Sequence, residues 1–159
     1  AAYGARVIAV DINEENLQRA KSLGAAYTIN ASRENVVDKI REITGDGANV
    51  SMDALGSRET STTSIRCLAK KGKHIQVGIL GGKKDLTISS ADLIAKEIEI
   101  IGSHGMPLAD YDTIFEMIAR KKIDLSLLID RTVKLEDVHQ ELLNMDDYSN
   151  YGMVVVDRF

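Results

Sequence analysis

The stretch Arg6-Val7-Ile8-Ala9-Val10-Asp11 decides how the rest of the sequence is interpreted. Its run of apolar, mostly β-branched residues ending in an acid predicts a buried parallel strand. A helix is predicted directly after it, because apolar residues recur every three positions from Leu17 to Leu23 and Gly24 follows as a stop signal. A buried strand joined to a helix is the repeating unit of an α/β sheet.

Strands and helices continue to alternate as far as about residue 103. Further strands are predicted at residues 27–29, 48–53, 73–77 and 97–103. Helices are predicted between them, from 36 to about 45, from the N-cap Ser57 through Ile65 and Leu68, and over 91–96. This alternation predicts a doubly wound parallel (Rossmann-like) α/β sheet, in which ligands bind at the carboxyl ends of the strands.

The pattern changes after Pro107. A helix is expected from about Asp110, strand-like apolar segments lie at 127–133 and 153–156, and an amphipathic helix is expected over 136–144. We therefore divide the chain into an α/β unit, residues 1–106, and a C-terminal segment, residues 107–159.

The composition excludes several classes of function. The net charge is −4 and no long run of Lys or Arg occurs, so a nucleic-acid partner is not expected. No apolar stretch reaches the ~18–20 residues that cross a bilayer, so a membrane partner is not expected either. The single cysteine, Cys67, excludes an internal disulfide and fits the reducing cytoplasm, where we place the protein.

Asp11 is the most informative single residue. An acid at the end of this strand of a dinucleotide-binding sheet accepts hydrogen bonds from the adenosine ribose hydroxyls and repels a 2′-phosphate. The next residues, Ile12 and Asn13, offer no Arg for such a phosphate, so NAD is favoured over NADP. The alternative interpretation is that Asp11 only caps the helix that follows.

Glycines follow two later strands. The segments Asp53-Ala54-Leu55-Gly56 and Val77-Gly78-Ile79 combine small or apolar residues with glycine, which lets backbone approach the two rings of a dinucleotide closely. The alternative is ordinary turn chemistry between a strand and a helix. The glycine-rich phosphate loop of such folds stands roughly 20 residues before the ribose acid, and Asp11 has only ten residues before it. We therefore expect a truncated dinucleotide-binding domain at residues 1–106, without its first strand and that loop.

Neither a metal site nor a catalytic group is expected in this chain. Cys67 lies in the third predicted helix and is interpreted as a small buried apolar residue. His74, His104 and His139 lie in different elements, with no further ligand at metal-binding spacing. His104 alone stands beside the expected cofactor edge, and we assign it no catalytic role.

Six short motifs in a fixed order resemble one family. They are VIAVD (7–11), AKSLGA (20–25), TIN (28–30), DALG (53–56), VGI (77–79) and IIGSHGM (100–106), and the endings LIDRTVKLEDV (128–138) and GMVVVDRF (152–159) agree with them. Over essentially the whole chain they resemble the zinc-dependent alcohol dehydrogenases of the medium-chain dehydrogenase/reductase superfamily. The resemblance implies that residues 1–106 are most of an NAD-binding domain. It also implies that residues 107–159 return to a catalytic domain encoded before them.

The resemblance also assigns cofactor contacts. Asp11 matches the ribose-binding acid, and Ile12 matches the residue that flanks the adenine. Three further segments match the surroundings of the adenosine (Ala54, Leu55 and Gly56), of the nicotinamide (Val77, Gly78 and Ile79) and of its carboxamide (Ser103 and Gly105). The sequence departs from the family pattern at Asn16 and near Met153, where basic residues are common.

By the same resemblance the parent protein is an NAD-dependent oxidoreductase that transfers hydride between NAD and an alcohol or polyol, with zinc bound by residues outside this chain. The 159 residues alone are then expected to be inactive. Residues 97–102 match the edge strand that pairs with a second copy in a homodimer. Two alternatives stay open: a non-catalytic dinucleotide-binding module, and a zinc-free quinone-reductase-like member of the superfamily.

Overall fold

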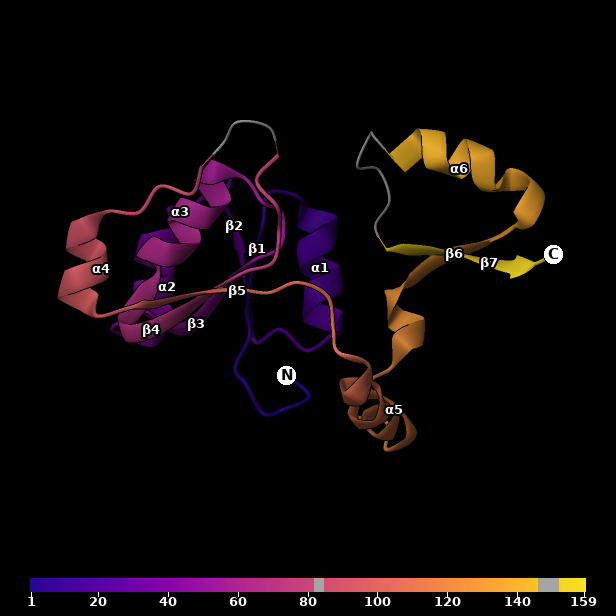
Figure 1. Cartoon of the computed structure of the whole chain (residues 1–159), viewed down its shortest axis with the longest axis horizontal. Coiled ribbons are helices and arrows are strands. Elements are labelled where there is room, and N and C mark those ends of the chain that lie inside the picture. The colour runs from indigo at the N-terminus through magenta and orange to yellow at the C-terminus, as the bar shows by residue number, and fades with distance from the viewer. Residues whose placement is uncertain (82–84, 146–151) are drawn as a thin grey trace.

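The computed structural model describes residues 1–81, 85–145 and 152–159. Figure 1 shows an α/β unit, coloured indigo to pink, and a separate C-terminal region, coloured orange to yellow. Within the described residues, no helix is long and apolar enough to cross a membrane.

The first half of the α/β unit begins with the predicted strand. β1 (Ile8–Asp11) pairs in parallel with β2 (Tyr27–Asn30). α1 (Glu14–Ser22) connects them, and the Asn13 side chain caps this helix by accepting a hydrogen bond from the Glu15 backbone N–H. α2 (Val36–Thr44) follows β2 and is capped in the same way by Asn35.

The second half is a three-stranded parallel sheet in the order β3-β4-β5. Its strands are β3 (Ala48–Asp53), β4 (Leu68–Gln76) and β5 (Glu99–Gly102). α3 (Arg58–Arg66) starts with a capping box, in which Ser57 and Thr60 each accept a hydrogen bond from the other's backbone N–H. α4 (Ser90–Lys96) leads into β5, which pairs with β4 and is the edge strand that its alternating pattern predicted.

The five strands of the α/β unit form two sheets, because β1 and β3 are not hydrogen-bonded to each other. Each of these strands therefore keeps one unpaired edge in the described structure. Apolar side chains on them are exposed, Val10 by 42%, Val50 by 58% and Met52 by 62%. A strand placed between β1 and β3 would pair with both edges and cover such side chains, in agreement with the prediction of a parallel sheet that lacks one strand.

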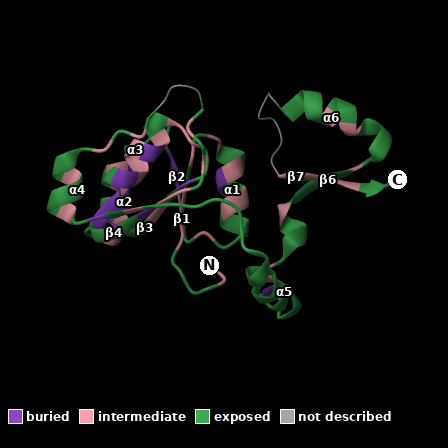
Figure 2. Ribbon diagram, in the orientation of Figure 1, coloured by how far each residue is buried: buried purple, intermediate pink, exposed green. Residues whose placement is uncertain are grey.

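The helix α2 packs against both sheets of the α/β unit. α2 contacts β2 of the first sheet and β3 of the second. Its apolar face belongs to a buried cluster formed by Ile29, Val36, Ile40 and Cys67, with Ile8 and Ala48 packed against it. A second cluster, Ile65, Leu68 and Ile98, lies on the other half of the unit. Figure 2 shows that the buried residues concentrate in this α/β unit and are sparse in the C-terminal region.

One predicted boundary is wrong. The sequence predicts Leu68 on the helix that starts after Ser57, but α3 ends at Arg66 and Leu68 is the first residue of β4. A buried residue three positions after Ile65 fits helical spacing and a strand start equally well, because both bury it. β4 is therefore longer than the predicted segment at 73–77.

The C-terminal region contains the predicted helices and strands in the predicted order. β6 (Ile129–Lys134) and β7 (Met153–Arg158) form a parallel pair. Between them lies α6 (Val138–Asn144), and α5 (Tyr111–Ala119) comes before them. Short 3-10 helices occupy Leu108–Asp110, Leu125–Leu128 and Leu135–Asp137. Asp110 directly precedes α5, although its side chain makes no capping hydrogen bond.

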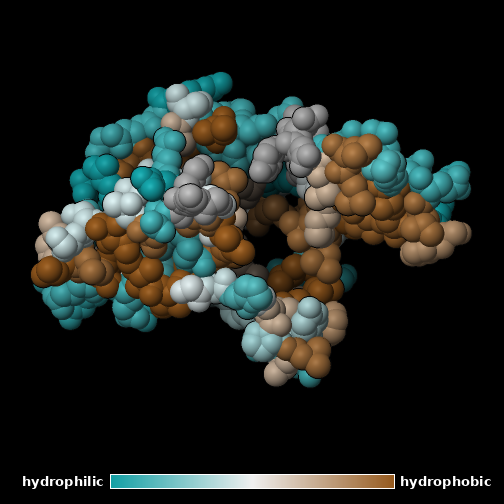
Figure 3. Space-filling view, turned by 45° about the horizontal axis from the view of Figure 1, so that its top comes forward, coloured by the Kyte–Doolittle hydropathy of each residue, from teal (hydrophilic) through white to brown (hydrophobic). Residues whose placement is uncertain are grey.

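Apolar side chains remain uncovered on this C-terminal region. Figure 3 shows brown, hydrophobic atoms over much of its visible surface. Leu135, Leu142, Leu143 and Met153 are among its exposed large apolar residues. An exposed apolar surface of this kind is typical of a face that packs against another part of a protein.

Candidate functional site

Most of the predicted site residues lie at the ends of parallel strands. We use the term carboxyl edge for residues 11–12, 54–56 and 77–79, which lie at or directly after the ends of β1, β3 and β4. In Figure 1 these three strands end on the upper side of the α/β unit, where α1 and α3 begin. Helix N-termini and strand ends at one edge are the usual surroundings of a ligand in an open parallel sheet.

Asp11 is held at the end of β1 by two hydrogen bonds. Its carboxylate accepts one from the Asn13 backbone N–H at 2.8 Å and one from the Asn16 side-chain amide at 3.1 Å. Asn13, and not Asp11, caps α1, so the alternative interpretation of Asp11 as the helix cap is wrong. Asn16 stands where the family pattern often has a basic residue, and here its neutral amide orients the acid directly.

The loops after β3 and β4 touch each other through backbone atoms. A Cβ atom on Gly78 would collide with the backbone of Leu55 and Gly56, and a Cβ on Gly56 would collide with the backbone of Gly78 and Ile79. Gly56 also has a φ of +79°, a left-handed conformation that favours glycine. Glycine is therefore required at both positions by a loop–loop contact that ordinary turn chemistry does not explain.

Large apolar side chains project from the carboxyl edge into solvent. Ile12, Leu55, Val77 and Ile79 are exposed by 72%, 64%, 42% and 81%. Four uncovered apolar residues from three neighbouring strand ends form a surface suited to flat apolar groups such as aromatic rings.

The structure places Ser103 next to this edge and does not connect Gly105 to it. The Ser103 backbone N–H donates to the Gln76 carbonyl oxygen at 2.9 Å, which fixes the end of β5 beside the end of β4. Gly105 lies two residues further on, exposed, with a φ of +63°. No hydrogen bond is described between Gly105 and the other predicted site residues.

Sequence reasoning missed a buried polar centre at Asp53. Its carboxylate accepts hydrogen bonds from the Leu55 and Gly56 backbone N–H groups and from the side chains of Thr60, Ser61 and Gln76. Burial alone would raise the pKa of the Asp53 carboxyl, but these donated hydrogen bonds outweigh burial and lower that pKa. The available signal was the pair of polar residues His74 and Gln76 at alternate positions of the predicted strand 73–77.

Metal and thiol chemistry find no support among the described residues. No group of three His, Cys, Asp or Glu side chains is placed to hold a metal ion in the described part of the chain. Cys67 is buried, as predicted, and burial raises the pKa of its thiol to about 11. It is the C-cap residue of α3 and does not lie in mid-helix.

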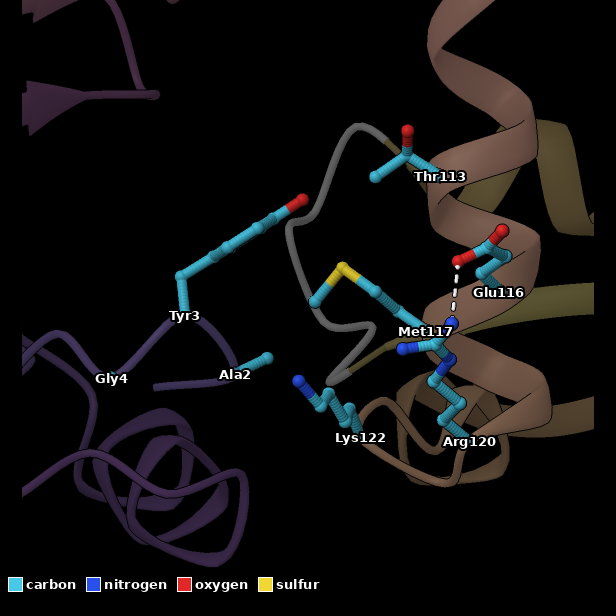
Figure 4. Close-up of a pocket in the computed structure, with 8 residues that line it drawn as sticks. All are labelled: Ala2, Tyr3, Gly4, Thr113, Glu116, Met117, Arg120 and Lys122. Carbon is cyan, nitrogen blue, oxygen red and sulfur yellow. Dashed lines mark ion pairs between the residues drawn. The ribbon is translucent and has the colours of Figure 1, made fainter.

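A cavity of about 420 Å³ lies away from the predicted residues, between the N-terminal residues and α5. Figure 4 shows Tyr3 and Met117 extending toward it from opposite sides, while Glu116 forms an ion pair with Arg120 at 3.1 Å. None of the predicted cofactor residues lines this cavity, whose lining is Ala2, Tyr3, Gly4, Thr113, Glu116, Met117, Arg120 and Lys122.

Comparison with known proteins identifies the family. A family model described as zinc-binding dehydrogenase matches residues 1–120. An NAD-dependent alcohol dehydrogenase of Sulfurisphaera tokodaii is 34% identical over 157 residues, which are 98% of this chain and 44% of that protein. D-xylulose reductase A of Aspergillus niger is 30% identical over 145 residues, which are 87% of this chain and 40% of that protein.

A solved structure agrees with these relatives. The alcohol dehydrogenase of the hyperthermophilic archaeon Aeropyrum pernix superimposes with a TM-score of 0.81 at 29% identity, over 96% of this chain and 42% of that one. The chain thus spans less than half the length of the proteins it matches. Because the family model covers 120 of the 159 residues, the chain belongs to the zinc-binding dehydrogenase family.

Proposed function

We propose that this chain is the NAD-holding part of an alcohol or polyol dehydrogenase. The observation that carries the proposal is the carboxyl edge, which has an oriented acid at the end of β1, two glycines in backbone contact after β3 and β4, and four exposed apolar side chains. The similarity to an NAD-dependent alcohol dehydrogenase over nearly the whole chain supports it.

Different residues of the carboxyl edge would contact different parts of the dinucleotide. Asp11 would accept hydrogen bonds from the adenosine ribose hydroxyls, and its charge would repel the 2′-phosphate of NADP. Ile12 and the segment 54–56 would flank the adenosine. Val77, Gly78 and Ile79 would support the nicotinamide ring, and Ser103 and Gly105 would lie near its carboxamide. Bound NAD supplies the hydride acceptor, so the task of these residues is to position its ring and exclude water.

The zinc expected for this family does not fit the residues that the structure describes. The described His, Cys, Asp and Glu side chains form no ligand set of three. We therefore assign the zinc ligands, and with them the activation of the alcohol oxygen, to residues outside this sequence. Within this chain we assign no proton transfer, and the 159 residues alone would not oxidise an alcohol.

Two finer properties complete the proposal. The outer edge of β5 has no strand partner among the described residues, and Ile101 on it is 39% exposed, so we assign a homodimer contact to this edge. We also place the protein in the cytoplasm, because its one cysteine, Cys67, is a buried free thiol.

The deciding experiment is a titration of NADH into the complete protein that carries residues 1–159. Residues 1–159 include no tryptophan, so the cofactor's own fluorescence can be followed, and bound zinc is counted in the same sample. Binding of NADH with zinc and with alcohol-dependent reduction of NAD supports the proposal. Binding without turnover of any alcohol favours a non-catalytic module, turnover without zinc favours a quinone-reductase-like enzyme, and a folded protein that binds no NADH refutes the proposal.

A further inference from the structure

Next to the carboxyl edge, several polar side chains are buried in the interior of the α/β unit, where apolar side chains are usual. Asp53, Ser61 and His74 are 4%, 0% and 0% exposed. Burying such groups costs several kcal/mol unless each one is hydrogen-bonded. Among the described residues, no buried side-chain nitrogen or oxygen lacks a hydrogen-bond partner. These groups therefore form a satisfied network, which has a fixed geometry.

The orientation of the Gln76 amide follows from Asp53. An ionised carboxylate only accepts, so Gln76 must present its amide nitrogen, which donates to Asp53 Oδ2 at 2.8 Å and to the Gly78 carbonyl oxygen at 2.7 Å. The Gln76 Oε1 atom then faces His74 Nε2 at 3.0 Å and accepts a hydrogen bond from it.

The network continues on the other side of His74. The Nδ1 atom of His74 is hydrogen-bonded to the hydroxyls of Ser51 and Ser64, at 3.1 and 3.2 Å. These serines belong to β3 and α3, whereas His74 and Gln76 belong to β4. Two strands and a helix are therefore connected by one chain of hydrogen-bonded side chains.

Gln76 is where this chain meets both loops of the carboxyl edge. Asp53 holds the loop after β3 through the Leu55 and Gly56 N–H groups, at 3.1 and 3.2 Å. The same amide nitrogen of Gln76 that binds Asp53 also binds the carbonyl of Gly78 in the loop after β4. Backbone hydrogen bonds from the Val77 and Gly78 N–H groups to the Asp53 carbonyl oxygen, at 3.0 and 2.9 Å, also join the two strand ends. Gln76 adds a side-chain link between the two loops.

We propose that Gln76 is a positioning residue that sets the spacing between the adenosine and nicotinamide halves of the cofactor site. The inference rests on the proposed function, because it assigns residues 54–56 to the adenosine and 77–79 to the nicotinamide. Gln76 does not touch the cofactor. It acts through Asp53 and the Gly78 carbonyl, and it favours ligands long enough to contact both loops over ligands that contact one.

The test compares Gln76→Met with wild type in the complete protein. Methionine keeps the length of the side chain and removes both donated hydrogen bonds and the one accepted from His74. The Kd for NADH is expected to rise about ten-fold, which corresponds to about 1.4 kcal/mol, because the two loops would no longer be held at the spacing that the whole cofactor needs. The Kd for AMP, which contacts only the adenosine half, is expected to change less than about three-fold on the same scale. Ile65→Val, which trims a buried side chain away from the network, is the matched control for lost stability.

A second variant makes the test independent of folding defects. The titratable groups that face Gln76 are Asp53 and His74. In Gln76→Glu the new carboxylate cannot donate to Asp53 at pH 8, but it regains a donor when protonated, so NADH affinity should recover as the pH is lowered toward 5.5. Wild type and Ile65→Val should not show this recovery.

Amide hydrogen exchange at Gly56 and Gly78 gives a readout that needs no cofactor. Exchange at both should accelerate in Gln76→Met beyond any change in Ile65→Val. Wild-type NADH affinity together with unchanged exchange in Gln76→Met would overturn the inference, as would a parallel loss of NADH and AMP affinity. If wild type binds no NADH, the proposed function fails, and the exchange rates still decide whether Gln76 positions the loops.

Discussion

The Arg19 guanidinium donates two hydrogen bonds to the carbonyl oxygen of Leu127, a residue 108 positions later in the chain, at 3.2 and 2.9 Å. It also donates to the Ile129 carbonyl at 3.1 Å and lies 4.0 Å from the Asp130 carboxylate. Arg19 belongs to α1, and Ile129 begins β6, so one side chain attaches the C-terminal region to the α/β unit.

Replacing Arg19 with alanine should loosen this attachment. Hydrogen bonds from a charged group to carbonyls contribute about 1–3 kcal/mol, and partial exposure of Arg19 favours the lower end of that range. Faster hydrogen exchange is therefore expected over residues 125–134, with little change in β4. Arg33→Ala, which removes an exposed ion pair with Glu14, is the control and should leave both regions unchanged. Equal acceleration in both variants would show that Arg19 has no special role in the attachment.

The Gly78→Ala substitution should be among the most damaging single-methyl changes in the chain. The added Cβ would collide with the backbone of Leu55 and Gly56, which cannot rotate away as a side chain can. A loss of stability above about 2 kcal/mol and a loss of NADH binding are expected, because overpacking against backbone forces the loops apart. Gly81→Ala adds the same methyl group where nothing lies within 4 Å, and urea unfolding should leave it close to wild type.

The Asp11→Asn variant should weaken NADH binding about ten-fold and narrow the preference for NADH over NADPH. Asparagine keeps one oxygen for the Asn13 backbone N–H but loses the negative charge that repels a 2′-phosphate. Titration with both reduced cofactors measures the two effects separately. Asp38→Asn, an exposed substitution on α2, is the control and should alter neither affinity. If the ratio of the NADH and NADPH affinities is unchanged in Asp11→Asn, Asp11 is not part of the cofactor site.

The free energy of unfolding should fall as the pH rises above 9, because the Cys67 thiol is buried in the folded protein. Burial raises the pKa of the folded thiol to about 11, above the usual value of 9.0, so the unfolded chain releases its proton first. The free energy of unfolding is therefore not reduced by this thiol below pH 9, and it falls by on the order of 2–3 kcal/mol as the pH approaches 11. Denaturant titrations at pH 8 and pH 10.5 measure this loss. The Cys67→Ala variant should lack it, and a thiol reagent at pH 8 should modify wild type only after unfolding.

Ile101→Glu should prevent association through β5. The substitution places a charge on the outer strand edge, where a second copy would pair. Light scattering should then give a mass half that of wild type, whereas Ile94→Glu, on the exposed side of α4, should leave the mass unchanged. A monomeric wild type would exclude the homodimer directly.

The sequence predicted the elements whose signals are local. Ser57 and the β-branched run before Asp11 each indicate an element within a few residues, and the strands and helices follow in the predicted order. Leu68 was misplaced because burial alone does not distinguish a helix end from a strand start. The resemblance supplied the cofactor residues as expectations, and their role in cofactor binding stays a prediction. Of these residues, the structure shows Gly56 and Gly78 in close backbone contact.

The Asp53 network could not be predicted in the same way. Its donors come from positions 7, 8 and 23 residues beyond Asp53, and only the folded sheet brings Thr60, Ser61 and Gln76 together. The Arg19 contact spans 108 residues and has no local signal at all. Each of these interactions depends on tertiary geometry and not on spacing along the chain.

The division of the five strands of the α/β unit into two sheets affects how the proposed site would select a ligand by its length. Asp11 belongs to one half-sheet, and Gly56 and Gly78 belong to the other, with α2 as a shared support. In the proposed site, a dinucleotide would therefore have to contact two groups of strands that no backbone hydrogen bond joins in the described structure. A strand that paired with both β1 and β3 would fix the distance between these two groups, so cofactor binding in the proposed site and cooperative folding of the unit would depend on the same backbone pairing.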